Sequence, residues 1–169
     1  MDILLVDGYN MIGAWPDLKK LKETDFAAAR DLLIEKMEEY QAITGFRVIV
    51  VFDAHSAAAG LRREDGRSVE VIFTRQNETA DERIEKLAIS LKNANTQVHV
   101  ATSDATEQWA IFGQGALRKS ARELYNEVCR MERQITAKLI EECQKKPFGK
   151  INFPSKIADI FEKWRREGK

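Results

Sequence analysis

The sequence is poor in the residues and runs that mark several classes of protein. Its 169 residues include two cysteines, three prolines and nine glycines, which excludes a disulfide scaffold, a collagen-like chain and a low-complexity segment. No apolar run is long enough to cross a membrane. The first apolar run, residues 3–6, is also too short and too close to Asp2 and Asp7 for a signal peptide. We therefore expect a cytoplasmic protein with no membrane partner.

The two cysteines, Cys129 and Cys143, both fall in one long helical pattern. Their spacing corresponds to about 21 Å along a helix, so the two thiols cannot pair there. Such cysteines are typical of reduced thiols in a cytosolic protein.

Several nucleotide-binding and hydrolase motifs are also absent. The sequence contains neither G-x-x-x-x-G-K-[ST] nor G-x-G-x-x-G, which argues against P-loop and Rossmann nucleotide sites. It contains no G-x-S-x-G nucleophile elbow. A response-regulator receiver would carry paired acids after its first strand, where only Asp7 stands.

Charge is balanced overall but unevenly distributed. The 27 basic and 27 acidic residues give a net charge of zero. Residues 1–114 carry 13 Lys and Arg against 19 Asp and Glu, whereas residues 115–169 carry 14 against 8. This asymmetry fits an acidic site beside a basic platform, and it equally fits a solvated basic helix surface.

Short apolar runs alternate with amphipathic patterns along the chain. The runs at 3–6, 48–52, 69–73 and 98–101 predict four strands, of which 69–73, with its one polar residue, lies near a sheet edge. Thr79 with Glu82, and Ser120 with Glu123, match capping boxes at two helix starts. The predicted helices cover 26–43, 80–91, 120–146 and 155–164.

Strands that alternate with helices predict an α/β fold, in which a parallel sheet is covered by helices on both faces. No linker or repeat divides the chain, so we expect one domain, 1–169, with a basic helical part from about residue 120. Ligands of such folds bind at the carboxyl ends of the strands. The residues that follow each strand are therefore the candidate functional residues.

Each predicted strand-to-helix junction carries an aspartate. Asp7, Asp53 and Asp104 follow the first, second and fourth strands, and Asp81 lies in the first turn of the helix after the third. Any one of them alone would be an ordinary helix cap or turn residue. Carboxylates gathered on one edge repel each other unless a cation or a shared proton compensates. Oxygen ligands without a Cys or His cluster favour Mg²⁺ or Mn²⁺.

A metal ion held by such carboxylates can activate a water molecule for hydrolysis. We expect Asp7, Asp81 and Asp104 to bind the metal directly or through water. Asp53 completes the catalytic set, as a fourth ligand or by orienting the others.

Three residues beside these acids are candidates for substrate contact. Asn10 would contact a phosphate or fix Asp7, or it would only cap a turn. Ser103 offers a hydroxyl at the end of the fourth strand, or it caps the next helix. Tyr9 is placed to stack on a base.

Basic residues that would hold a nucleic acid form two groups. Arg62, Arg63 and Arg67 lie in a glycine-bounded loop after the second strand, and their guanidinium forks suit phosphate. The C-terminal part interleaves basic residues with aromatics such as Trp164, a composition suited to RNA. The alternative for Trp164 is that it anchors the last helix to the domain.

The two histidines offer a possible route without metal. A two-histidine acid–base mechanism needs both rings beside one phosphate. His99 lies inside an apolar strand and is typical of a core residue, whereas His55 follows Asp53 on the rim. The pattern does not bring them together.

Several motifs resemble one known family. The segment VDGYN at 6–10 is similar to the first-strand signature of the NYN domains, a branch of the PIN-like nucleases. In family order, the further matches to acidic motifs are VFDA at 51–54, TADERI at 79–84 and ATSD at 101–104. The resemblance to the YacP-like proteins within that branch also covers GALR at 115–118 and SARE at 120–123.

The whole chain is similar to the YacP-like proteins, bacterial endoribonucleases that associate with the ribosome. The resemblance implies a three-layer α/β/α PIN-like (NYN) domain with a mostly parallel sheet and a C-terminal helical extension. It also implies a metal-dependent endoribonuclease that cleaves mRNA, not DNA, on the translating ribosome. The alternative is a noncatalytic RNA- or ribosome-binding module of the same fold. The acids favour catalysis, because a pure binder of polyanions gains nothing from clustered carboxylates.

Overall fold

The computed structural model describes residues 1–53, 68–103 and 115–145, with the backbone alone for 142–145. The chain divides into two compact units, Met1–Glu132 and Arg133–Lys169. The first unit contains the whole sheet. The predicted helix over 155–164 lies outside the described residues, and the single domain stays a prediction.

Strands and helices alternate through the described residues, which confirms the α/β fold class. The four predicted strands and three of the predicted helices are present, together with three elements that the sequence patterns did not indicate: α1, α2 and β5. The strands are β1 (Asp2–Asp7), β2 (Arg47–Phe52), β3 (Glu70–Phe73), β4 (Gln97–Thr102) and β5 (Leu117–Ser120). The helices are α1 (Gly8–Ala14), α2 (Pro16–Thr24), α3 (Phe26–Thr44), α4 (Ala80–Leu91) and α6 (Ala121–Lys145).

The five strands form one sheet in the order β3-β2-β1-β4-β5. Every pairing in it is parallel, so all five carboxyl ends meet at the same edge. β1 lies in the centre, with Leu4 opposite Val48 on one side and His99 on the other. β3 lies at an edge, as its polar residue predicted.

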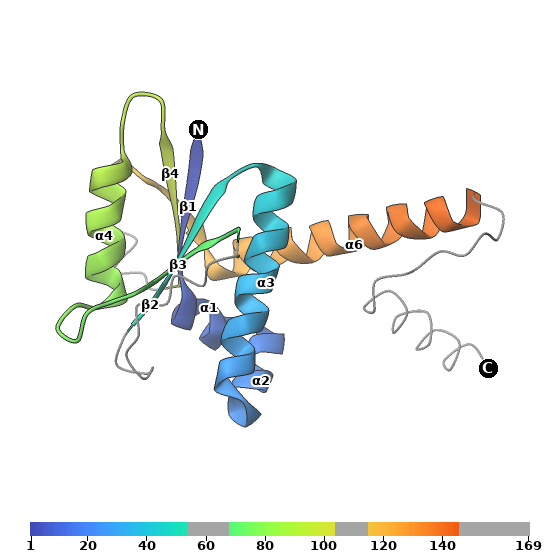
Figure 1. Cartoon of the computed structure of the whole chain (residues 1–169), viewed down its shortest axis with the longest axis horizontal. Helices are drawn as coiled ribbons and strands as arrows, with labels where there is room; N and C mark the ends of the chain where they lie inside the picture. The colour runs from blue at the N-terminus through green and yellow to red at the C-terminus, as the bar shows by residue number, and fades with distance from the viewer. Residues whose placement is uncertain (54–67, 104–114, 146–169) are drawn as a thin grey trace. The chain divides into compact units, whose positions relative to one another are not determined.

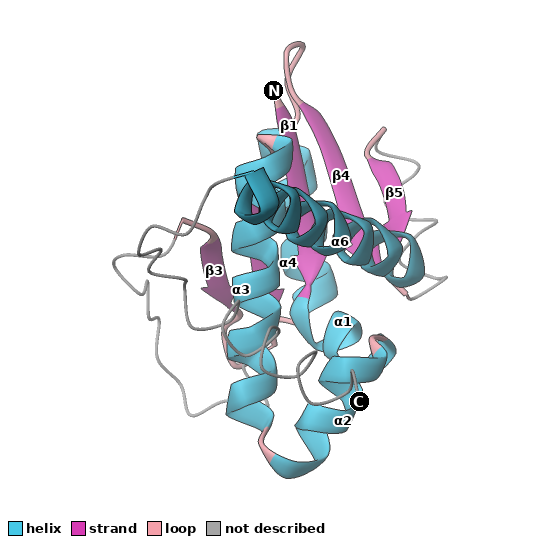
Figure 2. Ribbon diagram, turned by 90° about the vertical axis from the view of Figure 1, so that its right-hand side faces the viewer, coloured by secondary structure: helices cyan, strands magenta, loops and turns pink. Residues whose placement is uncertain are grey.

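Residues of β1 alternate between two separate cores. Ile3 and Leu5 pack with Ile84 and Ala88 of α4 on one face of the sheet. Leu4 and Val6 face the other core, to which α1, α2, α3 and the first turns of α6 contribute. Figure 1 shows α4 and α3 on opposite sides of the sheet, and Figure 2 looks onto the face that α3 covers. This arrangement is the expected three-layer architecture.

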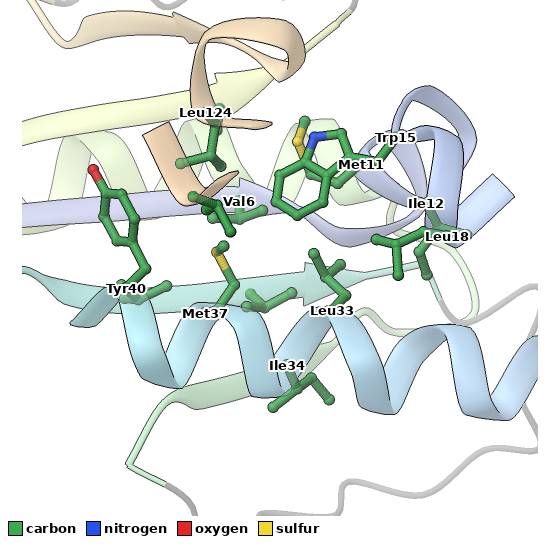
Figure 3. Close-up of a cluster of buried hydrophobic side chains, with 14 of the residues drawn as sticks. Val6, Met11, Ile12, Trp15, Leu18, Leu33, Ile34, Met37, Tyr40 and Leu124 are labelled. Atoms are coloured by element: carbon green, nitrogen blue, oxygen red, sulfur yellow. The ribbon is translucent and has the colours of Figure 1, made fainter. Parts of the chain in front are cut away.

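Trp15 joins the N-terminal helices to α6. Its side chain is 1% exposed, and its indole Nε1 donates to the carbonyl oxygen of Ala121 at 2.9 Å. The ring lies beside Met11 and near Leu124 in the core drawn in Figure 3. A buried indole needs such an acceptor, so this bond holds Trp15 against the first residue of α6.

Two mostly buried lysines tie α3 and β5 to α6. Lys36 Nζ lies 2.6 Å from Glu132 Oε1. Lys119 Nζ lies 2.7 Å from Glu127 Oε2 and 3.0 Å from the Tyr40 hydroxyl. Both lysines are therefore paired with a carboxylate, as burial of a charge requires.

Helix ends follow the capping chemistry of the sequence. Thr79 Oγ1 accepts from the Glu82 amide at 3.2 Å, which confirms the predicted cap of α4. Ser120 and Glu123 exchange both hydrogen bonds of a capping box, although Ser120 is also the last residue of β5. Gly45 ends α3 in the left-handed conformation, with φ +73°.

Gly8 allows a close approach between α1 and Phe52 of β2. A Cβ atom on Gly8 would lie 2.2 Å from Cε1 of Phe52, a side chain that is fully buried. Glycine is therefore required here for packing. Gly13, in the same helix, has no heavy atom within 4 Å of the corresponding position.

We expect Gly8→Ala to lower the free energy of unfolding by about 1–3 kcal/mol, because the added methyl group forces Phe52 out of a packed core. Gly13→Ala is the matched control, and it should be neutral or stabilise α1 by about 0.5–1 kcal/mol. Urea unfolding of both variants measures the difference. Equal stabilities would contradict the close packing of Gly8 on Phe52.

Candidate active site

Asp7 closes β1 and begins α1. Its Oδ1 accepts a hydrogen bond from the backbone amide of Asn10 at 3.0 Å, so the carboxylate caps the helix. The side chain is buried, with 5% of the residue exposed. A carboxylate is thus held inside the protein at the carboxyl edge of the central strand.

The alternation of β1 assigns Asp7 to a face of the sheet. Ile3 and Leu5 pack toward α4, and a strand repeats every two residues, so Asp7 lies on the α4 side as well. Asp81 lies in the first turn of α4 and is exposed. The helix N-terminus favours a negative charge at Asp81. The structure therefore brings Asp7 and Asp81 together from elements separated by more than seventy residues of sequence.

The environment of Asp7 disfavours its charged form. The pKa of Asp7 is raised from 3.8 to about 6. Burial is the main cause of the rise and the neighbouring charge of Asp81 adds to it, while hydrogen bonds from Asn10 and Tyr9 act in the opposite direction. A bound cation would offset both unfavourable effects. The carboxylate is thus poised to take up a proton or a cation.

Asn10 connects α1 to the end of β4. Its Nδ2 lies 3.4 Å from Thr102 Oγ1, and its Oδ1 accepts from the Ser103 amide at 3.1 Å. The Ser103 hydroxyl also donates to Asn10 Oδ1. Asn10 and Ser103 are therefore brought together beside Asp7. Asn10 fixes both Asp7 and the residues that lead out of β4.

Tyr9 and Asp53 lie on the β2 side of this site. The Tyr9 ring packs between Phe26 and Phe52, with centroid distances of 5.3 and 5.1 Å. Burial raises the pKa of Tyr9, the nearby Arg30 guanidinium lowers it, and the charge of Asp53 raises it. Asp53 is half-buried directly after β2. Stacking of Tyr9 on a base stays a prediction.

Four predicted site residues lie outside the described residues: Asp104, Arg62, Arg63 and Arg67. Within 1–53, 68–103 and 115–145, no three His, Cys, Asp or Glu side chains gather closely enough to hold a metal ion. The described part of the site is the Asp7–Asp81 pair. The complete metal-binding set stays a prediction.

His99 lies toward the other end of the sheet. Its Nε2 is 3.4 Å from Asp2 Oδ1, and its ring centroid is 5.2 Å from that of Phe46. Both contacts lie at the amino-terminal ends of strands, away from Asp7. His99 therefore packs as a structural residue, while His55 lies outside the described residues.

Phe26 and Arg30 were not indicated by the sequence, yet both contact the surroundings of Tyr9. They follow the N-cap Asp25 at the start of α3, four positions apart, on one face of the helix. The sequence did offer one signal for these two residues. It is the spacing of an aromatic residue and an arginine at the start of a helix that begins at the carboxyl edge.

A family model described as the YacP-like NYN domain matches residues 4–166 of the chain. This chain belongs to the YacP-like NYN family. The resemblance read from the motifs is thereby confirmed. Membership supports a nuclease-type, PIN-like role.

Family relatives from Bacillus subtilis match nearly the whole chain. The chain is 63% identical over 166 residues to "Uncharacterized protein YacP" of strain 168, which covers 98% of both proteins. It is 63% identical to the protein in the crystal structure of Rae1 (YacP), with a TM-score of 0.82 over 98% of this chain and 95% of that one. A crystal structure of the W164L mutant matches at 64% identity and a TM-score of 0.75, over 88% and 87% of the two chains. These matches confirm the family fold.

No helix among the described residues is both long and apolar enough to cross a membrane.

The raised pKa of Asp7 predicts a pH-dependent stability. Between about pH 4 and 6 the folded chain holds a proton that the unfolded chain has released, so stability falls as pH rises through this window. The difference corresponds to about 3 kcal/mol. We expect Asp7→Asn to keep the cap of α1 and to raise the free energy of unfolding at pH 7 by up to that amount.

The control for this variant is Asp25→Asn. Asp25 caps α3 in the same way, through Oδ1 and the Ala28 amide at 2.9 Å, but it is exposed. Urea unfolding at several pH values between about 4 and 7 should show a flatter profile for Asp7→Asn alone. A stability profile of Asp7→Asn identical to that of the wild type would contradict the burial of a titrating carboxylate.

Proposed function

We propose that this YacP-like chain is a metal-dependent endoribonuclease that cleaves mRNA in association with the translating ribosome. The observation that carries the proposal is the buried Asp7 carboxylate beside Asp81 at the carboxyl edge of the sheet. Phosphate chains are repelled by carboxylates, so an RNA-binding module has no use for a buried carboxylate beside a second acid. The association with the ribosome is proposed from the family resemblance alone. The cytoplasmic location follows from that association.

The residues present fit a hard divalent cation. Asp7 and Asp81 supply oxygen ligands, and the energetic disadvantage of ionised Asp7 is the condition that a cation relieves. Asp53 directly follows β2, the strand that pairs with β1, and so lies at the same edge of the sheet as Asp7. Asp104 follows Ser103, which Asn10 holds. We propose that Asp7, Asp81 and Asp104 hold Mg²⁺ or Mn²⁺, with Asp53 orienting them.

The chain's own residues would position the reacting groups. Mg²⁺ or Mn²⁺, when bound, polarises a phosphoryl oxygen and lowers the pKa of a water molecule. Asp7 is held rigidly because it is buried and caps α1, while Asp81 remains accessible on α4. Asn10 keeps β4 aligned with β1 through Thr102 and Ser103. A phosphodiester would therefore meet the oxygen ligands Asp7 and Asp81, which are held by β1 and α4.

We expect Asp7→Asn and Asp81→Asn each to reduce RNA cleavage by more than about a hundredfold, since loss of even a residue that orients a metal ligand costs about 10–100-fold. Both variants should remain folded by circular dichroism and should bind Mn²⁺ more weakly in calorimetry. Labelled mRNA fragments, with and without ribosomes, provide the cleavage assay, and EDTA should abolish the wild-type reaction.

Asp25→Asn is again the control, because it replaces an exposed capping aspartate at the start of α3. It should cleave RNA like the wild type. Undiminished cleavage by both site variants would exclude this metal set. Binding of RNA or ribosomes without any cleavage, by wild type and variants alike, would favour the noncatalytic module.

Arg62, Arg63 and Arg67 are proposed to hold the RNA against the acidic edge, because the N-terminal part of the chain has a net negative charge. Their replacement by Ala should weaken RNA or ribosome association without changing Mn²⁺ binding. The slope of the logarithm of the binding constant against the logarithm of the salt concentration should become shallower by about 0.7–0.9 for each phosphate interaction removed. An unchanged affinity and slope would assign RNA binding to other basic residues, such as Lys145, Lys146 and Lys150.

A further inference from the structure

A row of aromatic rings borders the candidate active site on the α3 side of the sheet. Phe26, Tyr9, Phe52 and Phe73 contact one another in that order, with centroid distances of 5.3, 5.1 and 5.5 Å. They come from α3, α1, β2 and β3, and Figure 1 shows α1 beside the first half of α3. The row therefore runs along the carboxyl edge, from the start of α3 to the edge strand.

Arg30 lies at the α3 end of this row. Its Cζ is 5.9 Å from the centroid of the Phe26 ring, one helical turn earlier. Its guanidinium also lies close enough to the Tyr9 hydroxyl to lower the pKa of Tyr9, whereas the charge of Asp53 raises that pKa. Arg30 is half-buried. The aromatic ring beneath it restricts the guanidinium plane, which prepares its fork of donors for a planar or tetrahedral anion.

Arg30 differs from the other half-buried cations on this face of the sheet. Lys36 and Lys119 each form an ion pair with a glutamate of α6, at 2.6 and 2.7 Å. Among the residues that the structure describes, Arg30 forms no ion pair. A guanidinium partly removed from water, without a carboxylate, is a favourable position for an anion from outside the protein.

The neighbouring acids restrict what that anion can be. Asp7, Asp53 and Asp81 line the same edge, so a free anion would be repelled by them. An anion that belongs to a longer chain can still be kept beside Arg30, because other parts of that chain are bound elsewhere on the protein. A polynucleotide has this property, because its phosphates are linked and its bases can lie over aromatic rings.

We propose that Arg30 binds a phosphate of the RNA strand, other than the one that is cleaved, and so sets the direction of the strand across the site. The proposal rests on the proposed nuclease function for the identity of its ligand. Asp81 lies on the α4 side of the sheet and Arg30 on the α3 side, with Asp7 at the end of the strand between them. The RNA strand would thus cross the carboxyl edge from α4 toward α3.

The test measures RNA binding separately from cleavage. Arg30→Gln and Arg30→Lys are made in full-length Asp7→Asn protein, so that a short fluorescent single-stranded RNA stays intact during anisotropy titrations at about 50–300 mM KCl. Removal of one phosphate interaction with a single strand should lower the log–log salt slope by about 0.7. We expect Arg30→Gln to weaken binding by about tenfold, as for loss of a charged hydrogen bond. Arg30→Lys should keep the slope.

Arg47→Gln is the matched control. Arg47 is exposed, pairs with Glu70 at 2.7 Å, and lies at the start of β2, at the opposite edge of the sheet. Its substitution removes the same charge at the edge of the sheet that the proposed RNA strand does not cross. The RNA affinity and the salt slope should therefore stay unchanged. The proposal is overturned if Arg30→Gln and Arg47→Gln have the same RNA affinity and the same salt slope. It is also overturned if Arg30→Lys loses as much affinity as Arg30→Gln.

The outcome for Arg30 is independent of the nuclease assay. If wild-type protein fails to cleave RNA but Arg30→Gln flattens the salt slope, the phosphate contact stands and the nuclease proposal falls. If wild-type protein cleaves RNA and the slope of Arg30→Gln is unchanged, the nuclease proposal stands and the phosphate contact falls. Thermal melts of all variants confirm that the compared proteins are folded.

Discussion

The hydrogen bond from the Asn10 amide to Asp7 is the contact on which the carboxyl edge depends. It ends β1 and begins α1 within one residue, so the chain turns immediately after the central strand of the sheet. That turn places Tyr9 against β2 and aims Asn10 at the end of β4. A single carboxylate therefore performs a structural task while it remains inside the protein beside a second acid.

The two faces of the sheet have different tasks. On one face, α4 contributes a small core, and its N-terminus presents Asp81 beside Asp7. On the other face a larger core joins α1, α2, α3 and α6, and Trp15 links its N-terminal helices to α6. The acidic groups and the aromatic row thus belong to opposite faces, and they meet only where the strands end. A substrate that contacts both must lie across that edge.

Much of the fold could be predicted, because its longest signals are strong. Continuous apolar runs marked the buried strands, and Thr79 marked the start of α4 correctly. The short helix α1 was not predicted, because Asp7-Gly8-Tyr9-Asn10 has the composition of a turn; its helix forms through the Asp7 cap and burial of Met11 and Ile12. β5 was missed because Leu-Arg-Lys-Ser is polar and largely exposed, and only pairing with β4 makes it a strand.

The candidate site was predictable only in part, for a similar reason. Parallel strands bring their carboxyl ends to one edge, so the placement of Asp7 and Asp53 follows from the pattern of strands. The burial of Asp7 and its interaction with Asp81 depend on how α4 packs, which spacing alone does not reveal. Arg30 lies in a helix whose only visible signal was its apolar face, so its position beside Tyr9 required the tertiary structure.

The central position of β1 has a consequence for the order in which the protein is made. β1 is synthesised first, and Leu4 pairs with Val48 and with His99, which follows about 95 residues later. At ribosomal rates of about 5–20 residues per second, that interval is about 5–20 s. During it, one side of a mostly apolar strand has no neighbour, and the nascent chain presents an open sheet edge of the kind that templates aggregation. Since α4 lies between β3 and β4, the acidic pair also assembles only in the second half of that interval.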